Sequence, residues 1–301
     1  MQAKLAALVE QIDPTAKLQK SWPLRGGVSA QVTALEIVRA DGQVQRWVVR
    51  QHGTADRQRN PQIAADEFKL LQMVAAAGVV VPQPIYVELT GEILGIPALV
   101  VEFVDGTSEF TPRDIDHFTY QLALQLHKIH AIHPAHVALD FLPKQRYSLP
   151  PRPAQLDETL SEGRIRHALA GWDPRHHANP PTLLHGDYWP GNILWQNGTL
   201  AAVIDWEDAQ FGDPLADVAN CRFELAWTVS PEAMARFTHH YKALSNSALA
   251  TLDFTNLPYW DLRAALRPAG KLSSWGLDAE TEQRMRTAHH AFSEEALQHC
   301  G

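Results

Sequence analysis

Three side chains with oxygen donors, Asp187, Asn192 and Asp205, lie close together in the sequence and suggest what chemistry the chain performs. Between the last two, a pair of apolar segments is separated by Asn197-Gly198, which is typical of a two-residue hairpin turn. A hairpin brings the ends of its strands together, so we expect the three side chains to converge. Carboxylate and amide oxygens are suitable ligands for Mg²⁺, and a further carboxylate can orient a hydroxyl group and accept its proton.

The spacing of these residues matches a known pattern for phosphoryl transfer. The catalytic loop of protein kinases contains an Asp, four intervening residues and an Asn, followed by a metal-binding Asp on the next hairpin. Asp187 and Asn192 have this spacing, but His185-Gly186 replaces the His-Arg that precedes the kinase Asp. An ordinary loop with solvated acids is the alternative, because one Asp before a turn is common. The complete set, which extends to Asp217, favours the catalytic interpretation.

The segments HGDYWPGNILW, which starts at His185, and VIDWEDAQFGDPLADVA, which starts at Val203, closely resemble the aminoglycoside phosphotransferase family. This family includes choline, homoserine and macrolide kinases. The resemblance is specific across residues 183–219 and weaker elsewhere. It implies an α+β, bilobal protein-kinase-like fold, with an antiparallel five-stranded sheet plus a helix in the N-lobe and a mostly helical C-lobe. The lobes would be residues 1–104, which bind the nucleotide, and residues 105–301, which carry catalysis and bind the acceptor.

The same resemblance assigns roles to the residues of the central segment. Asp187 would be the catalytic base, and Asn192 and Asp205 would hold Mg²⁺. His185 and Asp217 would give structural support, with the carboxylate of Asp217 bracing the backbone of the catalytic loop. A surface helix acid is the alternative interpretation of Asp217, since acidic side chains are mostly exposed.

A nucleotide site in the first lobe is also implied by the resemblance. It would consist of a phosphate-covering turn, a phosphate-binding cation with its acidic partner, and a hinge whose backbone pairs with the base of ATP or GTP. In sequence order these residues are Gly26, Gly27, Ser29, Arg50, Glu67, Glu102, Phe103 and Val104. By itself, a Gly-Gly pair between strands is more often only a turn.

Arg50 departs from the family pattern, which has a lysine at this position. Arginine presents a planar fork whereas lysine is a compact point charge, so the geometry toward the nucleotide would differ. The helical spacing of residues 63–77 places Glu67 on a helix, where we expect it to pair with Arg50; Asp66 is the second choice. A solvated arginine at a strand end is the alternative.

The composition excludes several classes of partner. The formal net charge is −8, with 26 basic against 34 acidic residues, and no long basic run occurs, so nucleic acid is not expected as a partner. The negative charge suits a cationic acceptor, but we attribute it to solubility. No run approaches the roughly 18 apolar residues that span a bilayer, so no membrane partner is expected. We expect a cytoplasmic monomer or homodimer.

Together these features predict a small-molecule O-phosphotransferase that moves the γ-phosphate of ATP or GTP to a substrate hydroxyl with Mg²⁺. The acceptor would be an antibiotic or, alternatively, a metabolic amino alcohol, amino acid or sugar such as choline or homoserine. A catalytically inactive nucleotide-binding sensor is a third possibility, which the complete Asp187, Asn192 and Asp205 set disfavours. A protein kinase is disfavoured by His185-Gly186 and by the lack of an Ala-Pro-Glu segment.

The acceptor pocket is harder to predict, because the variable helices of the second lobe would supply it. Three tryptophans are available to shape such a pocket, and three acids are available to bind an amine. Each is more often a structural or exposed residue than a ligand contact. These candidates are Trp227, Trp260, Trp275, Glu224, Asp253 and Asp261.

Overall fold

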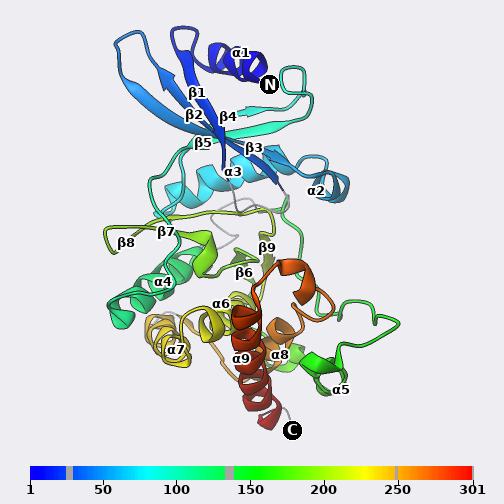
Figure 1. Cartoon of the computed structure of the whole chain (residues 1–301). Helices are drawn as coiled ribbons and strands as arrows, with labels where there is room; N and C mark the ends of the chain where they lie inside the picture. Colours follow the sequence, from blue (N-terminus) through cyan, green and yellow to red (C-terminus); the bar gives the residue numbers. More distant parts are fainter. Residues whose placement is uncertain (25–29, 133–138, 248–249, 300–301) are drawn as a thin grey trace. The chain divides into compact units, whose positions relative to one another are not determined.

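The computed structural model describes residues 1–24, 30–132, 139–247 and 250–299, and these residues cluster into two compact units (Figure 1). The first unit comprises Met1–Gly106 and Ala201–Glu207, and the second comprises Thr107–Leu200 and Asp208–Gly301. The division predicted from sequence, at 104/105, left residues 201–207 in the second lobe, whereas the structure groups them with the first unit. The predicted phosphate-covering residues Gly26, Gly27 and Ser29 lie outside the described residues.

The first unit is built on a five-stranded antiparallel sheet with the strand order β1-β2-β3-β5-β4. Its strands are β1 (Lys17–Pro23), β2 (Ala30–Val38), β3 (Val44–His52), β4 (Pro84–Glu88) and β5 (Ala98–Glu102). Its helices are α1 (Gln2–Ile12), α2 (Thr54–Arg59) and α3 (Ile63–Ala76). The predicted five-stranded sheet with a helix is therefore confirmed, and the unit contains the short helix α2 as well.

Side chains of β3 alternate between two environments, as the period of a strand requires. Trp47 and Val49 are buried in a cluster that includes Leu5 and Leu8 of α1. Arg50 lies on the opposite face of the strand from these residues. The alternation therefore gives the sheet an apolar face toward α1 and puts a cation on the other face.

The helix α3 carries its apolar stripe at helical spacing and has an acid within that stripe. Ile63, Leu70, Leu71 and Val74 are buried, and Glu67 is buried among them with 5% of its surface exposed. A carboxylate on the core face of a helix is costly unless it is paired. This burial is the first indication that Glu67 has a specific partner.

The second unit is mostly helical, as predicted. Its helices are α4 (Ile115–His130), α5 (Glu162–Ala170), α6 (Leu215–Thr228), α7 (Pro231–Ser245), α8 (Leu257–Ala265) and α9 (Ala279–Gln298). α6 is buried along nearly its whole length and packs against α7, α8 and α9. This helix therefore forms the centre of the second unit.

Short strands join the helices of the second unit. β6 (Thr182–Leu184) pairs antiparallel with β9 (Gln210–Gly212), β7 (Ile193–Gln196) pairs with β8 (Thr199–Val203), and β10 (Asn246–Ser247) pairs with β11 (Ala250–Thr251). The boundary between the two units falls within β8. The turn between β7 and β8 has positive φ at both Asn197 (52°) and Gly198 (78°), which is the conformation that the predicted hairpin turn requires.

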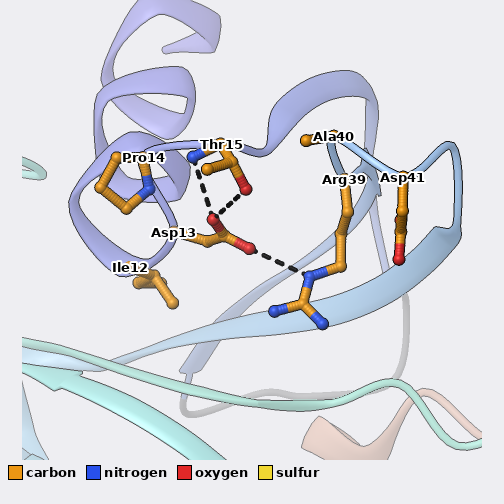
Figure 2. A pocket seen from close by; sticks show the side chains of 7 residues that line it. All are labelled: Ile12, Asp13, Pro14, Thr15, Arg39, Ala40 and Asp41. Carbon is orange, nitrogen blue, oxygen red and sulfur yellow. Dashed lines mark hydrogen bonds and ion pairs between the residues drawn. The ribbon is translucent and has the colours of Figure 1, made fainter.

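A surface depression of about 360 Å³ lies in the first unit, between the end of α1 and the turn after β2 (Figure 2). Asp13 accepts hydrogen bonds there from Thr15 and from Arg39 Nε, which lies 3.0 Å away. None of the predicted site residues lines this depression. Among the described helices, none has the length and apolar character needed to cross a membrane.

Candidate active site

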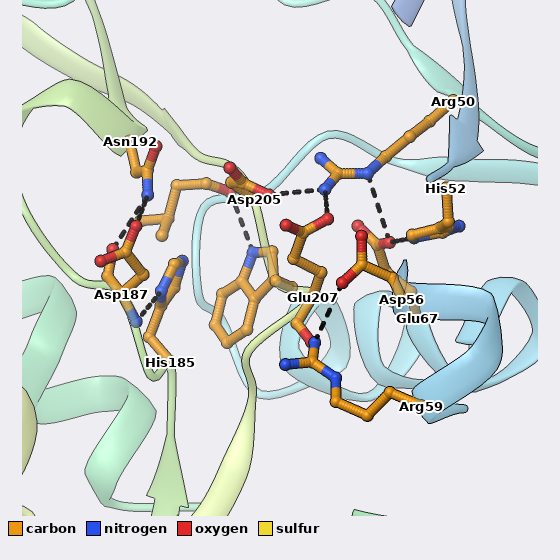
Figure 3. A network of polar contacts seen from close by, with 12 residues as sticks. Arg50, His52, Asp56, Arg59, Glu67, His185, Asp187, Asn192, Asp205 and Glu207 are labelled. Carbon is orange, nitrogen blue, oxygen red and sulfur yellow. Dashed lines mark hydrogen bonds and ion pairs between the residues drawn. The ribbon is translucent and has the colours of Figure 1, made fainter. Parts of the chain in front are cut away.

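Arg50, His52 and Glu67 form a buried polar group in the first unit (Figure 3). Nε of Arg50 lies 3.5 Å from Oε2 of Glu67, so the predicted ion pair is present. Nε2 of His52 lies 2.5 Å from the same oxygen. Arg50 and His52 are two residues apart on β3, and this spacing puts both on the face that meets α3. The contact of His52 with Glu67 was not predicted from the sequence.

Two further carboxylates of the first unit meet Arg50 (Figure 3). Nη2 of Arg50 donates to Oδ1 of Asp205 and to Oε2 of Glu207, each at 2.5 Å. Burial alone would lower the pKa of Arg50, but the carboxylates of Glu67, Asp205 and Glu207 outweigh this effect and raise it. One guanidinium thus gathers three carboxylates from α3 and from the segment after β8.

These contacts explain why residues 201–207 belong to the first unit. Besides the bonds to Arg50, the backbone N–H of Val203 donates to the carbonyl of Val80 at 2.8 Å. Asp205 itself has a φ of 68°, in the left-handed region that Asp and Asn adopt more readily than most other residues. The backbone at this position therefore tolerates a short polar side chain and disfavours a bulky one.

Asp187 and Asn192 are brought together in the second unit by the loop after β6 (Figure 3). Nδ2 of Asn192 donates to the backbone carbonyl of Asp187 at 2.9 Å and to its Oδ2 at 3.0 Å. Because the amide nitrogen is committed to Asp187, Oδ1 of Asn192 is directed away from that carboxylate and keeps its lone pairs. The pair therefore presents one carboxylate and one amide oxygen.

The loop that carries Asp187 is held by Asp217 of α6. Asp217 accepts hydrogen bonds from the backbone N–H groups of His185 (2.7 Å) and Gly186 (2.9 Å), and it is 2% exposed. Nε2 of His130, on α4, lies 3.3 Å from Oδ2 of Asp217. Burial alone would raise the pKa of Asp217, but the contact with His130 and the nearby His185 outweigh burial and lower it. The predicted bracing contact is thus present.

Gly186 occupies a position that no other residue fits without a shift of the backbone. Its φ is 84°, and a Cβ atom there would lie 2.0 Å from the carbonyl oxygen of Asp208. The carbonyl of Asp208 therefore leaves no room at position 186 for the arginine of the kinase His-Arg-Asp sequence.

Arg267 and Asn220 also contact the loop that carries Asp187, and no pattern in the sequence predicted these contacts. Nη2 of Arg267 donates to Oδ1 of Asp187 at 2.7 Å, and Nη1 donates to Oδ1 of Asn220. Nδ2 of Asn220 in turn donates to the carbonyl of Tyr188 at 3.2 Å. Arg267 follows Asp187 by 80 positions, just after α8, so no local pattern connects the two.

The predicted hinge residues already serve the sheet of the first unit in part. The backbone N–H of Glu102 donates to the carbonyl of Gln83 at 2.8 Å, and that of Phe103 donates to the carbonyl of Arg46 at 3.0 Å. Val104 has no backbone hydrogen bond from its N–H to another described residue. Within the described residues, the sheet thus engages the N–H groups of Glu102 and Phe103 but not that of Val104.

The acidic candidates for an acceptor pocket differ widely in their surroundings. Asp261 is buried and accepts two hydrogen bonds from Arg222, at 3.0 and 3.1 Å, so it already has a cationic partner. Glu224 is buried and accepts from Nε1 of Trp227 at 2.9 Å. Asp253 is exposed and lies 3.1 Å from Nδ1 of His177. Of the three acids, Glu224 is the one whose electrostatic environment includes Asp187 and Arg267.

The tryptophan candidates are equally unlike one another. Trp260 is 3% exposed and belongs to the core of the second unit. Trp275 is 37% exposed, and its ring stacks on that of Trp227 with centroids 6.4 Å apart. The Trp227–Trp275 pair therefore links the surface to the buried Glu224.

Comparison with known proteins settles the family. The model of the phosphotransferase enzyme family matches residues 23–254, which is most of the chain and includes Arg50, Glu67, Asp187, Asn192, Asp205 and Asp217 but not Arg267. The chain belongs to this family. Within the phosphotransferase enzyme family, it is 42% identical over 55 residues to the hygromycin-B 4-O-kinase of Escherichia coli, a match that covers 18% of this chain and 16% of that protein.

A second relative in the comparison is the homoserine kinase of Methylocella silvestris. It is 29% identical over 175 residues, which cover 54% of this chain and 53% of the kinase. The matches to these two relatives therefore span about half of the relatives' own length or less. They support membership of the phosphotransferase enzyme family without transferring either acceptor to this chain.

Solved structures show the same fold. The aminoglycoside phosphotransferase APH(4)-Ia, as a thermostable mutant in a ternary complex with AMP-PNP and hygromycin B, aligns with a TM-score of 0.67 at 18% identity. The alignment covers 97% of this chain and 98% of that one. The predicted protein-kinase-like fold of the aminoglycoside phosphotransferases is thereby confirmed.

Proposed function

We propose that this member of the phosphotransferase enzyme family transfers the γ-phosphoryl group of a nucleoside triphosphate to the hydroxyl of a small molecule. The observation that supports it most is the arrangement of Asp187 and Asn192 in a loop that Asp217 braces through two backbone hydrogen bonds. Phosphoryl transfer depends mainly on positioning and electrostatic stabilisation, so a rigid loop with oxygen donors suits it.

Asp187 is the proposed catalytic base. Its side chain is 30% exposed, which leaves it accessible to a hydroxyl, and its Oδ2 is oriented by Asn192. In a loose transition state the proton of the acceptor leaves late, so Asp187 chiefly orients the hydroxyl and then accepts its proton. His185 and Asp217 support this geometry through the backbone of the loop.

Asn192 and Asp205 are the proposed Mg²⁺ ligands. Both supply hard oxygen donors, and the Asn192 amide keeps Oδ1 directed away from Asp187, as a metal ligand requires. When bound there, Mg²⁺ would supply positive charge that offsets the charge developing on the transferred phosphoryl group.

Arg50 and Glu67 are proposed to position the phosphates in the first unit. Arg50 carries the cation expected near a triphosphate, and Glu67 fixes its side chain. Gly26, Gly27, Ser29 and the segment Glu102-Phe103-Val104 complete the proposed nucleotide site. We leave ATP and GTP as alternatives, since backbone contacts decide between them.

Two acceptor classes follow from the names of the relatives. A hygromycin kinase and a homoserine kinase both appear among them, so an antibiotic and a metabolic amino acid are both compatible with the family. A nucleotide-binding sensor without activity is the third alternative, and it is disfavoured by the complete set of oxygen donors. A cytoplasmic location is proposed because the nucleotide is available in that compartment, and the protein is proposed to be a monomer or a homodimer.

A direct assay tests the proposal. The full chain is incubated with Mg²⁺ and ATP or GTP, together with a panel of hydroxyl acceptors, and phosphorylated product is followed by ³¹P NMR. We expect nucleotide consumption that requires Mg²⁺ and falls about 10²–10⁴-fold in Asp187→Ala. If wild type and Asp187→Ala consume nucleotide equally, or neither does with any acceptor, the proposed function is wrong.

The metal assignment has its own test. Asn192→Ala, Asp205→Asn and the double variant form a cycle in which the Mg²⁺ concentration for half-maximal activity is measured. Residues that hold one ion should give strongly non-additive effects, whereas independent residues should give additive ones. Asn at position 205 suits the left-handed backbone there. Additive effects would contradict a shared ion.

A further inference from the structure

Arg267 binds the carboxylate of Asp187, the proposed base. Its Nη2 donates to Oδ1 of Asp187 at 2.7 Å, while Asn192 binds the other carboxylate oxygen. A hydroxyl that is bound to Asp187 must therefore lie next to this guanidinium. The inference that follows rests on the proposed function, since it takes Asp187 as the acceptor-binding carboxylate.

The guanidinium is held in place by the protein and is still open to solvent. Nη1 is anchored to Asn220, which is 3% exposed and is itself bonded to the carbonyl of Tyr188. The side chain of Arg267 remains 39% exposed. A guanidinium has five N–H groups, and described side chains accept only from Nη1 and Nη2, so donors remain for a ligand.

The charge of Arg267 distinguishes between acceptor classes. A polycationic acceptor placed against Asp187 would bring its ammonium groups close to a fixed cation, and like charges in a partly desolvated site repel strongly. An anionic group would instead meet a planar fork that suits carboxylate and phosphate oxygens. Glu224 offsets this charge only in part, because burial raises its pKa to about 7 and leaves its carboxyl partly protonated near neutral pH.

We propose that Arg267 determines the specificity of the acceptor site and that the acceptor is a hydroxy compound bearing an anionic group, a carboxylate or a phosphate, within reach of the guanidinium. On binding, the anion takes up the remaining donors of Arg267 while the hydroxyl bonds to Asp187. Asn220 keeps the guanidinium in position throughout.

The test uses sets of acceptors that match in length and differ in charge. One set is 4-hydroxybutyrate, 4-hydroxybutyramide and 4-amino-1-butanol, with shorter and longer homologues, and glycerol 3-phosphate against glycerol provides the phosphate arm. Binding to the full chain is measured by calorimetry without nucleotide, and phosphorylation is measured with Mg²⁺ and ATP or GTP. We expect the anionic member of at least one set to bind at least 10-fold more tightly than its neutral and cationic partners.

Variants of Arg267 test whether this residue causes the preference for anionic acceptors. Arg267→Gln should raise Kd and KM for the anionic acceptor roughly 10- to 100-fold and leave those for the neutral amide unchanged, since a bond to a charged group is lost. Arg267→Lys keeps the charge and should restore part of the affinity. Arg236→Gln is the matched control, because Arg236 is a similarly exposed arginine of the same unit that is paired with Asp116. This control should bind like the wild type.

Several outcomes would overturn the inference. These are tighter binding of the amine or the amide in every set, no preference for any anion, or an equal loss of kcat for all acceptors in Arg267→Gln. The last result would indicate a purely structural part for Arg267. If anions bind through Arg267 but no phosphoryl group is transferred, the anion site stands and the proposed function fails.

Discussion

The two units hold their acidic side chains by different means. In the first unit, Glu67, Asp205 and Glu207 converge on the single guanidinium of Arg50. In the second, Asp217 is held by backbone N–H groups and by His130, and Asp187 is oriented by an amide of Asn192. The first arrangement depends on one cation, whereas the second depends on the path of the backbone. The proposed nucleotide-binding part is therefore sensitive to charge, and the proposed catalytic loop is sensitive to shape.

The largest expected effect separates chemistry from folding in the second unit. Asp187→Ala should lower turnover about 10²–10⁴-fold, because it removes the proposed base. Asp187 is partly exposed and its loop is braced from elsewhere, so the thermal midpoint should change little. Activity and melting are measured on the same preparation. A collapse of the fold in this variant would mean that Asp187 also carries the shape of the loop.

Replacement of Arg50 tests whether the first unit depends on one cation. Arg50→Met removes the guanidinium that Glu67, Asp205 and Glu207 share, and breaking a buried ion pair costs about 3–5 kcal/mol of unfolding free energy. Arg50→Lys keeps the charge and should recover part of the loss. Urea denaturation at low and high Mg²⁺ is the measurement. If Arg50→Met unfolds at the wild-type urea concentration, the carboxylates have another source of stabilisation.

Replacement of Asp217 tests the dependence of the second unit on backbone hydrogen bonds. Asp217→Ala leaves the N–H groups of His185 and Gly186 without an acceptor, at a cost of about 2–4 kcal/mol. Asp217→Asn retains one acceptor oxygen and should lose less. Amide hydrogen exchange at the two positions reports the loss directly. Unchanged protection of these amides would show that Asp217 is not their acceptor in solution.

The smallest expected effect concerns pH and a second acid on α6. Burial raises the pKa of Glu224 to about 7, with Arg267 opposing the rise and Asp187 adding to it. The pKa of Glu224 in the folded state lies above its ordinary value of 4.5. The contribution of Glu224 to the free energy of unfolding is therefore fully present below pH 4.5 and is lost as pH rises through 7. Asp217, whose pKa is lowered, shows the opposite trend and loses its contribution as pH falls.

Glu224→Gln should remove this pH dependence while keeping an acceptor for Trp227. We expect the variant to gain roughly 1–3 kcal/mol of unfolding free energy relative to the wild type between pH 5 and pH 8. Chemical denaturation at several pH values is the measurement, and Asp253→Asn, an exposed acid, is the control. Parallel curves for Glu224→Gln and the wild type would show that Glu224 does not titrate in this range.

Local patterns account for the part of the site that the sequence predicted. The Asn197-Gly198 turn and the spacing of Asp187 and Asn192 are set within one stretch of chain, whereas the bracing by Asp217 was implied by the family resemblance. The pairing of Arg50 with Glu67 needed the family resemblance, since strand alternation alone does not say which helix faces a strand. The roles of all these residues remain predictions.

Contacts between distant segments account for what the sequence missed. Arg267 reaches Asp187 only because α8 packs against α6 in the second unit. His52 meets Glu67 because β3 extends two residues beyond Arg50, which puts His52 on the same face of the strand. A histidine at the end of a strand has no sequence pattern that predicts such a contact. The grouping of residues 201–207 with the first unit depends on Val80 and Arg50, which lie more than a hundred positions earlier.

The chain passes from one unit to the other after Gly106, after Leu200 and after Glu207. A gene fragment that encodes only the N-terminal stretch would therefore produce a sheet in which Arg50 retains Glu67 and lacks its other two acidic partners. A chimera between relatives inherits the same difficulty. A single crossover would combine Arg50 from one parent with Asp205 and Glu207 from the other. Residues 201–207 must therefore be exchanged together with the N-terminal stretch.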